Sequence, residues 1–145
     1  MNSYWIDSVD KIEGKTIDKD YEADVCIIGA GITGLSTGYY LAKEGLKVII
    51  IDKKGIGEKA SGHTTAKITL QHNLIYDYLI NSFDEEFARK YFEANDNAIK
   101  NIKEIIESEK IDCDFEYQPN FVYTENQDKV LKIQKEVDAI NKLSR

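Results

Sequence analysis

Long hydrophobic runs and an excess of basic charge are both missing from this chain, and each absence excludes a class of protein. No apolar run approaches the roughly 20 residues that a membrane-spanning helix needs. The 19 lysines and arginines are outnumbered by 26 acidic residues, and the net charge of −7 gives no electrostatic basis for nucleic-acid binding. We therefore expect neither a membrane span nor a nucleic-acid partner.

Cysteine and histidine are scarce as well. Cys26 and Cys113 are far apart and form no CxxC motif, and His63 and His72 lack a third ligand for a metal. No metal site is predicted, and both histidines are expected to be structural, with a direct role in ligand binding as the alternative. Since no signal peptide is recognisable, the two cysteines are expected to be reduced thiols in the cytoplasm, with Cys26 buried.

A glycine-rich turn is the most informative feature that the sequence does contain. Residues 25–28 are apolar and predict a strand, and Gly29, Gly31 and Gly34 follow with the spacing GxGxxG. Gly29 permits a tight reversal, Gly31 has no Cβ to hold a pyrophosphate away from the backbone, and Gly34 lets a helix pack closely on the strand. A helix beginning near Ile32 would direct its N–H groups and the positive end of its dipole at the phosphates.

The pattern continues through that helix into a second strand. Helical spacing runs from Thr33 to about Glu44, Gly45 stands where a left-handed C-cap is expected, and Gly38 suggests close approach of the helix to the sheet. Residues 48–51 are apolar and predict a parallel strand buried on both faces. These elements predict an α/β chain with a Rossmann-like βαβ fold that binds FAD or NAD(P).

The second strand ends in Asp52, about 20 residues beyond the glycines, where an acid is expected in this fold. A carboxylate there accepts hydrogen bonds from ribose hydroxyls and repels a 2′-phosphate, which favours FAD or NAD over NADP. Lys53 and Lys54 soften that preference. Two alternatives stay open: an independent NAD-binding domain, and an Asp52 that is only a solvated acid.

The segment after Asp52 separates FAD from NAD. It contains residues 60–62, Ala-Ser-Gly, and resembles the D-amino-acid oxidase-like FAD-dependent oxidoreductases, the family that includes glycine and sarcosine oxidases. Members of that family carry a loop Ala-Ser-Gly-Arg-Asn-x-Gly along the flavin ribityl chain and ring. In this chain His63 replaces the arginine, Thr64 the asparagine and Ala66 the last glycine.

A closer resemblance is to the subgroup of that family with a C-terminal Rieske-type iron–sulfur domain. Its motifs are matched by Ser-Gly-His-Thr-Thr-Ala-Lys at residues 61–67, Thr-Leu-Gln-His at residues 69–72 and Ser-Tyr-Trp-Ile-Asp at residues 3–7. The resemblance implies hydride transfer from an amine-type or related small substrate to FAD, with reoxidation by oxygen or by an iron–sulfur partner outside this chain. It also implies that the catalytic residues lie outside this chain.

The predicted cofactor ligands lie in the glycine turn, at the end of the second strand and in the small-residue loop. Hydroxyl groups of that loop can donate to phosphate or flavin oxygens and leave space for a planar ring, although an ordinary polar connection is the alternative. Lys67 is considered too, because a cation near a reduced flavin stabilises its negative charge. The predicted ligands are Gly29, Gly31, Ile32, Thr33, Gly34, Asp52, Lys53, Ser61, Gly62, Thr64 and Thr65.

The second half of the sequence predicts a long amphipathic helix. Ser82 and Glu85 have the spacing of a capping box, and helical periodicity continues to about Lys110. Its apolar face is expected to consist of Phe87, Tyr91, Ala94, Ala98, Ile102 and Ile105.

Two strands and a last helix are expected after the long helix. The strands are predicted at residues 113–117 and 121–124, with a turn at Pro119 and Asn120 between them, and Phe121 is expected to face a core. The last helix should bury Val130, Ile133, Val137 and Ile140.

The predicted organisation has three parts. An arm at residues 1–22 packs on a FAD-binding βαβ unit and flavin loop at residues 23–82, and residues 83–145 begin a substrate domain. Because oxidases of the resembling family are more than twice as long as these 145 residues, a non-catalytic fragment that needs further polypeptide is the remaining alternative.

Overall fold

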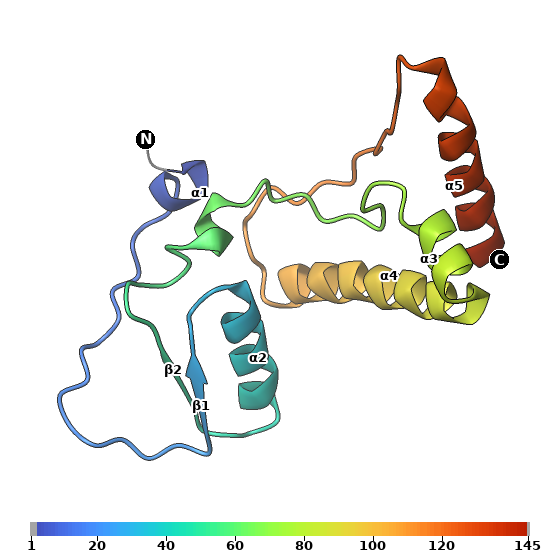
Figure 1. Cartoon of the computed structure of the whole chain (residues 1–145). Helices are drawn as coiled ribbons and strands as arrows, with labels where there is room; N and C mark the ends of the chain where they lie inside the picture. The colour runs from blue at the N-terminus through green and yellow to red at the C-terminus, as the bar shows by residue number, and fades with distance from the viewer. Residues whose placement is uncertain (1–2, 145) are drawn as a thin grey trace. The chain divides into compact units, whose positions relative to one another are not determined.

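The structure is a computed structural model that describes residues 3–144 (Figure 1). The chain divides into two compact units, and the boundary in the sequence lies between Lys67 and Ile68. Each unit is described by itself. The elements in chain order are α1 (Tyr4–Asp7), β1 (Val25–Ile28), α2 (Ile32–Lys43), β2 (Val48–Ile51), the 3₁₀ helix η1 (Ala60–His63), α3 (Tyr76–Ser82), α4 (Glu85–Ser108), the 3₁₀ helix η2 (Gln127–Lys129) and α5 (Val130–Leu143).

The first unit contains a small parallel sheet joined by a helix. β1 pairs with β2 in register from Val25 opposite Val48 to Ile28 opposite Ile51, and α2 makes the connection between them. Gly45 follows α2 with a φ of +85°, the left-handed conformation in which glycine avoids a Cβ clash. The predicted strand, helix, C-cap and strand are confirmed, and the chain is a mixed α/β structure consistent with part of a FAD-binding fold.

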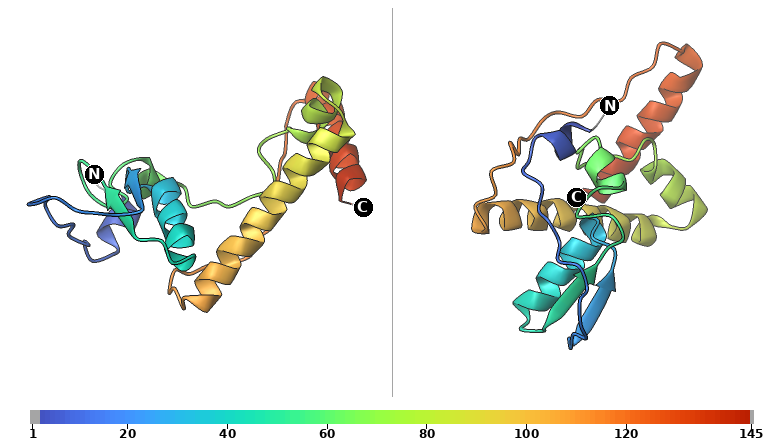
Figure 2. Two further views of the ribbon diagram at one scale, coloured as in Figure 1. Left: turned by 90° about the horizontal axis from the view of Figure 1, so that it is seen from below. Right: turned by 90° about the vertical axis from the view of Figure 1, so that its left-hand side faces the viewer.

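Two glycines let α2 lie close to the sheet. A Cβ on Gly34 would stand 2.0 Å from the carbonyl oxygen of Gly29, and a Cβ on Gly38 would stand 2.7 Å from Cδ1 of Ile50. The close approach predicted for Gly34 and Gly38 is therefore confirmed. The two views of Figure 2 show α2 lying along the strand pair.

The opposite face of the strand pair is open, so the expected burial on both faces is wrong. All four residues of β2 are half-buried, and Cys26 and Ile28 of β1 are exposed, Ile28 to 86%. The reason is that α2 covers the other face, where Val25 and Ile27 are half-buried. In the described part of the chain β1 has β2 as its sheet neighbour on one side, and no third strand joins the sheet.

The second unit is built from three helices. Figures 1 and 2 show α3 and α5 gathered at the N-terminal end of α4. The ring of Tyr76 is fully buried and meets the rings of Tyr91 and Phe92 edge-on, an arrangement that aromatic pairs favour. None of the helices in residues 3–144 combines the length and apolar character needed to cross a membrane. The buried cluster consists of Tyr76, Leu79, Ala88, Ala139 and Leu143.

The predicted capping box of the long helix is wrong. Ser82 is the last residue of α3, a helix that the sequence analysis did not predict, and α4 is instead capped by Asp84. The Asp84 carboxylate accepts from the N–H of Phe87 at 2.7 Å, three residues on, which satisfies one of the free amides of the first turn. The helix ends at Ser108, close to the predicted Lys110.

The buried faces of the two long helices also differ from the prediction. In α4, Tyr91, Ile102 and Ile105 are half-buried as expected, but Phe87, Ala94 and Ala98 are exposed and Ala88 is buried instead. In α5, Ile133 and Ile140 are half-buried whereas Val130 and Val137 are exposed. Both helices pack against the short helix α3. This contact changes which residues of α4 and α5 are buried. The buried residues of α5 are Glu136, Ala139 and Leu143.

The two strands expected between α4 and α5 do not form. Residues 111–126 contain no helix or strand, Pro119 and Asn120 form no turn, and Phe121 is 78% exposed instead of facing a core. A strand needs a neighbour with which to pair, and the described residues supply none at this place. The Asn120 side chain instead donates to Oε1 of Gln71 at 3.0 Å and to Oγ1 of Thr69 at 3.4 Å.

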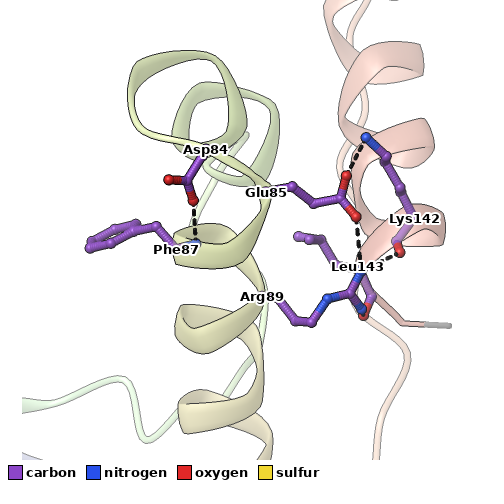
Figure 3. A network of polar contacts seen from close by, with 6 residues as sticks. All are labelled: Asp84, Glu85, Phe87, Arg89, Lys142 and Leu143. Carbon is purple, nitrogen blue, oxygen red and sulfur yellow. Dashed lines mark hydrogen bonds and ion pairs between the residues drawn. The ribbon is translucent and has the colours of Figure 1, made fainter.

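A polar network fastens the end of α5 to the start of α4 (Figure 3). Arg89 donates from Nη1 to the carbonyl oxygen of Leu143 at 2.7 Å and from Nη2 to Oε1 of Glu85 at 2.9 Å. Lys142 forms an ion pair with the other oxygen of Glu85. The guanidinium thus satisfies a carbonyl group that the last turn of a helix leaves free.

Candidate cofactor site

The glycine turn joins β1 to the N-terminus of α2. Gly29 has a φ of +113° and donates to the carbonyl oxygen of Ile51 at 2.7 Å, which fastens the turn to the end of β2. Gly31 is the extended N-cap of α2 and has no side chain with which to cap it. The amides of the first helical turn are therefore directed at acceptors from outside the helix.

Asp52 supplies the first acceptor, to the glycine turn just before α2. Its Oδ2 accepts from the N–H of Ala30 at 2.9 Å, and its Oδ1 accepts from the amides of Lys54 at 2.8 Å and Gly55 at 3.4 Å. The hydrogen bond from Lys54, followed by that from Ala30, lowers the pKa of the Asp52 carboxyl to about 2. Asp52 is thus ionised at neutral pH, and the second lone pair of Oδ2 can accept from a hydroxyl group.

Ser61, in η1, supplies the second acceptor. Its Oγ accepts from the N–H of Ile32 at 2.9 Å and lies 3.1 Å from the place that a Cβ on Gly31 would take. The absence of a side chain at Gly31 therefore makes room for the Ser61 hydroxyl. That hydroxyl still has its own proton to donate, for example to a phosphate oxygen.

A second pair of glycines holds the loop that carries Ser61. Gly62 is buried, and a Cβ there would stand 2.4 Å from the carbonyl oxygen of Gly57. Gly57 has a φ of +70° and donates to the carbonyl oxygen of Ala30 at 2.9 Å. Gly57 and Ala30 are not among the residues predicted from the sequence, although a Gly-x-Gly pair at 55–57 is an ordinary turn signal.

Helix α1 packs against the same loop. The indole N–H of Trp5 donates to the carbonyl oxygen of Thr64 at 2.7 Å, and a Cβ on Gly62 would stand 2.9 Å from Cγ1 of Ile6. Trp5 and Ile6 belong to the opening motif noted in the sequence, but their contact with this loop has no signal in the sequence.

The structure brings some of the predicted ligands together and leaves others apart. Gly29, Gly31, Ile32, Gly34, Asp52 and Ser61 gather around the turn, and Gly62 supports it. The side chain of Thr64 forms a hydrogen bond within its own loop, in which Oγ1 accepts from the N–H of Ala66 at 3.1 Å. Lys53, Thr65 and Thr33 are exposed, and the Thr33 carbonyl oxygen accepts from Thr37.

The two histidines have partners within their own units. Nδ1 of His63 lies 2.8 Å from the carbonyl oxygen of Lys59, and Nε2 of His72 lies 3.4 Å from Oδ1 of Asn95. The ring of His72 also packs edge-on against the ring of Tyr91, with 6.3 Å between the ring centroids. In residues 3–144 no three His, Cys, Asp or Glu side chains are grouped as a metal site would need.

The chemistry of this donor set suits the ADP part of a dinucleotide. The N-terminus of α2, which receives no cap from Gly31 itself, offers its remaining amides to a diphosphate, and the ionised Asp52 offers an acceptor to a ribose hydroxyl. Ser61, whose Oγ accepts from the N–H of Ile32, still has one hydroxyl proton to donate. No lysine is needed for such a site, because backbone amides do the anion binding.

Known proteins resemble the chain over most of its length. The model of the DAO family, described as FAD dependent oxidoreductase, matches residues 24–144. YhfW of Bacillus subtilis (strain 168), whose name describes a Rieske 2Fe-2S iron–sulfur protein, is 43% identical over 141 residues, which are 97% of this chain and 28% of YhfW. Gamma-glutamylputrescine oxidoreductase of Escherichia coli (strain K12) is 30% identical over 131 residues, 90% of this chain and 30% of that protein.

A third relative agrees with these two. OrdL of Haemophilus influenzae, named as an oxidoreductase, is 33% identical over 116 residues, 79% of this chain and 27% of its own length. The chain thus spans less than a third of each of these relatives. No solved structure matches it. Since the family match includes the whole glycine turn, Asp52 and Ser61, the chain belongs to the DAO family of FAD-dependent oxidoreductases, whose cofactor is FAD.

Proposed function

We propose that this chain forms the FAD-binding part of an oxidoreductase that takes a hydride from an amine-type or related small substrate. The observation that carries the proposal is the convergence of Asp52 and Ser61 on the amides of Ala30 and Ile32, on either side of Gly31. A relative whose name refers to gamma-glutamylputrescine supports an amine-type substrate.

The residues of the chain would bind and orient the cofactor. In a Rossmann-like arrangement, the turn from Gly29 to Gly34, including Ile32 and Thr33, receives the pyrophosphate, and Asp52 receives the ribose. Bound FAD supplies the redox chemistry by accepting the hydride. Lys53 and the loop residues Ser61, Gly62, Thr64 and Thr65 complete the proposed ligand set.

The remaining proposals concern organisation and partners. By function, we divide the chain into an arm at 1–22, a FAD-binding part at 23–82 and the start of a substrate domain at 83–145, although α3 within 23–82 packs with α4 and α5 in the second compact unit. The chain works in the cytoplasm. The Rieske protein among its relatives supports an iron–sulfur centre as the acceptor of electrons from the flavin. The groups that contact the substrate are contributed from outside these residues.

Two alternatives differ in what they predict. An independent NAD-binding domain would hold NAD through Asp52 and would not retain FAD. A non-catalytic fragment would fold fully only with further polypeptide, an idea favoured by the 86% exposure of Ile28 on the open face of the sheet.

The test is gel filtration of the purified chain after refolding with FAD and, separately, with NAD. Bound FAD is measured by its visible absorbance, and bound NAD by the ultraviolet absorbance of the small molecule released on denaturation. We expect near-stoichiometric flavin absorbance that is released on denaturation. Gly34→Ala is the matched control, because its Cβ would collide with the carbonyl of Gly29 in the turn. A folded chain that keeps NAD but not FAD would overturn the proposal.

A further inference from the structure

The two amides that flank Gly31 are both held by side chains from the segment after β2. Ala30 donates to Asp52, and Ile32 donates to Ser61, across 22 and 29 positions of sequence. We infer that Asp52 and Ser61 are positioning residues that hold the glycine turn in its cofactor-binding conformation before FAD arrives. This inference rests on the proposed function and assigns to Asp52 a role beyond that of a ribose ligand.

Asp52 is suited to this role because it bridges three backbone amides at once. Ala30 lies after β1 and is only 5% exposed, while Lys54 and Gly55 lie after β2. A carboxylate forms stronger hydrogen bonds with amides than a neutral acceptor does. The single side chain therefore locks the glycine turn to the end of the neighbouring strand.

Ser61 is suited to it because its own loop is held in place. Gly62 fits against Gly57 with no room for a Cβ, and Gly57 in turn donates to the carbonyl oxygen of Ala30. The N–H of Ala30 thus binds Asp52 while its carbonyl group binds Gly57. Both the N–H and the carbonyl group of Ala30 are therefore hydrogen-bonded within the chain itself.

Preorganisation matters here because the turn contains three glycines in six residues. Glycine has more backbone freedom than any other residue, so a loose turn would lose much of it on binding. Electrostatics alone predicts the opposite effect of Asp52, since a carboxylate repels a pyrophosphate. If neutralising Asp52 weakens pyrophosphate binding, the cause must therefore be a change in the conformation of the glycine turn and not the removal of charge.

The first measurement is amide hydrogen exchange by NMR on the full chain without cofactor, for the original protein, Asp52→Asn and Ser61→Ala. We expect exchange at Ala30 to become at least tenfold faster in the first variant, and exchange at Ile32 in the second. Asp24→Asn is the matched control, because Asp24 accepts from the N–H of Lys47 at 2.7 Å by the same chemistry. That control should change exchange at Lys47 and leave Ala30 and Ile32 unchanged.

The second measurement is the dissociation constant for FAD and, separately, for inorganic pyrophosphate. We expect both constants to rise at least tenfold in Asp52→Asn and Ser61→Ala and to stay within twofold in Asp24→Asn. A role of Asp52 as ribose ligand alone would weaken FAD and leave pyrophosphate unchanged or tighter. That result would overturn the inference.

Other outcomes are also decisive. If exchange at Ala30 and Ile32 stays the same in the two variants, the turn does not depend on these side chains and the inference fails, whatever happens to FAD. If exchange accelerates but both dissociation constants are unchanged, the contacts are structural only and the inference fails again. If the original chain binds pyrophosphate but not FAD, the proposed function fails while both measurements still decide the inference. Ser61→Ala removes one hydroxyl and keeps the test available if Asp52→Asn does not fold.

Discussion

The carboxylate of Glu136, on α5, accepts a hydrogen bond at 3.0 Å from the backbone N–H of Tyr76, the first residue of α3. Its other oxygen accepts from the N–H of Asp77 at 2.8 Å. Glu136 is 1% exposed, and the residue before α3, Ile75, provides no side-chain cap. One helix therefore caps another across 60 positions of sequence, and the negative charge lies at the positive end of the α3 dipole.

Glu136→Ala should destabilise the three-helix unit by roughly 1–3 kcal/mol, because two amides lose their acceptor in a buried place. Glu136→Gln should cost less, since its amide oxygen can still accept from one of the two. Chemical denaturation followed by circular dichroism measures both. Lys132→Ala, on an exposed position of the same helix, is the control; equal stability of Glu136→Ala and Lys132→Ala would contradict this account.

Lys142→Met should raise the pKa of Glu85 toward its ordinary value. The pKa of this carboxyl is lowered first by the hydrogen bond from Lys142 and then by that from Arg89. Because the folded pKa is lowered, the stabilisation is complete above the ordinary carboxyl pKa and is lost as pH falls through the lowered one. A carboxyl-carbon NMR titration of Glu85 measures the change, and an unchanged titration in Lys142→Met would show that the pair in Figure 3 does not form in solution.

Asp52 should make the first unit sensitive to acid. Its pKa is about 2 in the folded chain against an ordinary value of 3.8, so its stabilising effect is complete above pH 4 and disappears as pH falls toward 2. In Asp52→Asn, stability should vary less over this pH range. Unfolding of the β1–β2 unit, followed by the amides of β1 from pH 5 to pH 2, provides the comparison, and parallel pH curves for the two proteins would refute the expectation.

Gly34→Ala should be far more damaging than Gly38→Ala. The new Cβ at position 34 meets the backbone carbonyl of Gly29, which cannot move without opening the turn, whereas the Cβ at position 38 meets the flexible end of Ile50. At position 38 a gain in helix propensity of about 1 kcal/mol offsets part of the clash. Thermal unfolding of the two variants and their FAD retention distinguish these cases; similar losses in both would count against the backbone clash.

Ile28→Lys should reduce self-association of the purified chain. Ile28 lies on the open face of the strand pair, and among residues 3–144 β1 has a sheet neighbour on one side. An exposed apolar strand with an unpaired edge favours pairing with other chains. Light scattering as a function of protein concentration measures the effect. Val9→Lys, at a residue that is 65% exposed outside the sheet, is the matched control for added charge; an equal reduction by both variants would show that net charge alone is responsible.

Much of the first unit could be predicted from local sequence. The apolar runs at 25–28 and 48–51, the glycine spacing and Gly45 identify strand, turn, helix and strand without knowledge of any contact. Each of these signals depends on backbone conformation or on the periodicity of neighbouring residues, which a single segment already contains. The family resemblance carried by residues 60–67 rests on the same kind of local pattern.

The partners of those segments were decided by the tertiary structure. Nothing near Glu136 in sequence indicates that it caps α3, and nothing near Asp52 indicates that it binds Ala30, because both hydrogen bonds join positions more than 20 residues apart. The two strands expected at 113–117 and 121–124 failed for a related reason: their local pattern is suitable, but a strand also requires a neighbour. Local sequence thus determined the elements and the glycine turn of this protein, while only the three-dimensional packing decided which amides, carboxylates and faces meet, since those contacts depend on residues that the chain brings together after folding.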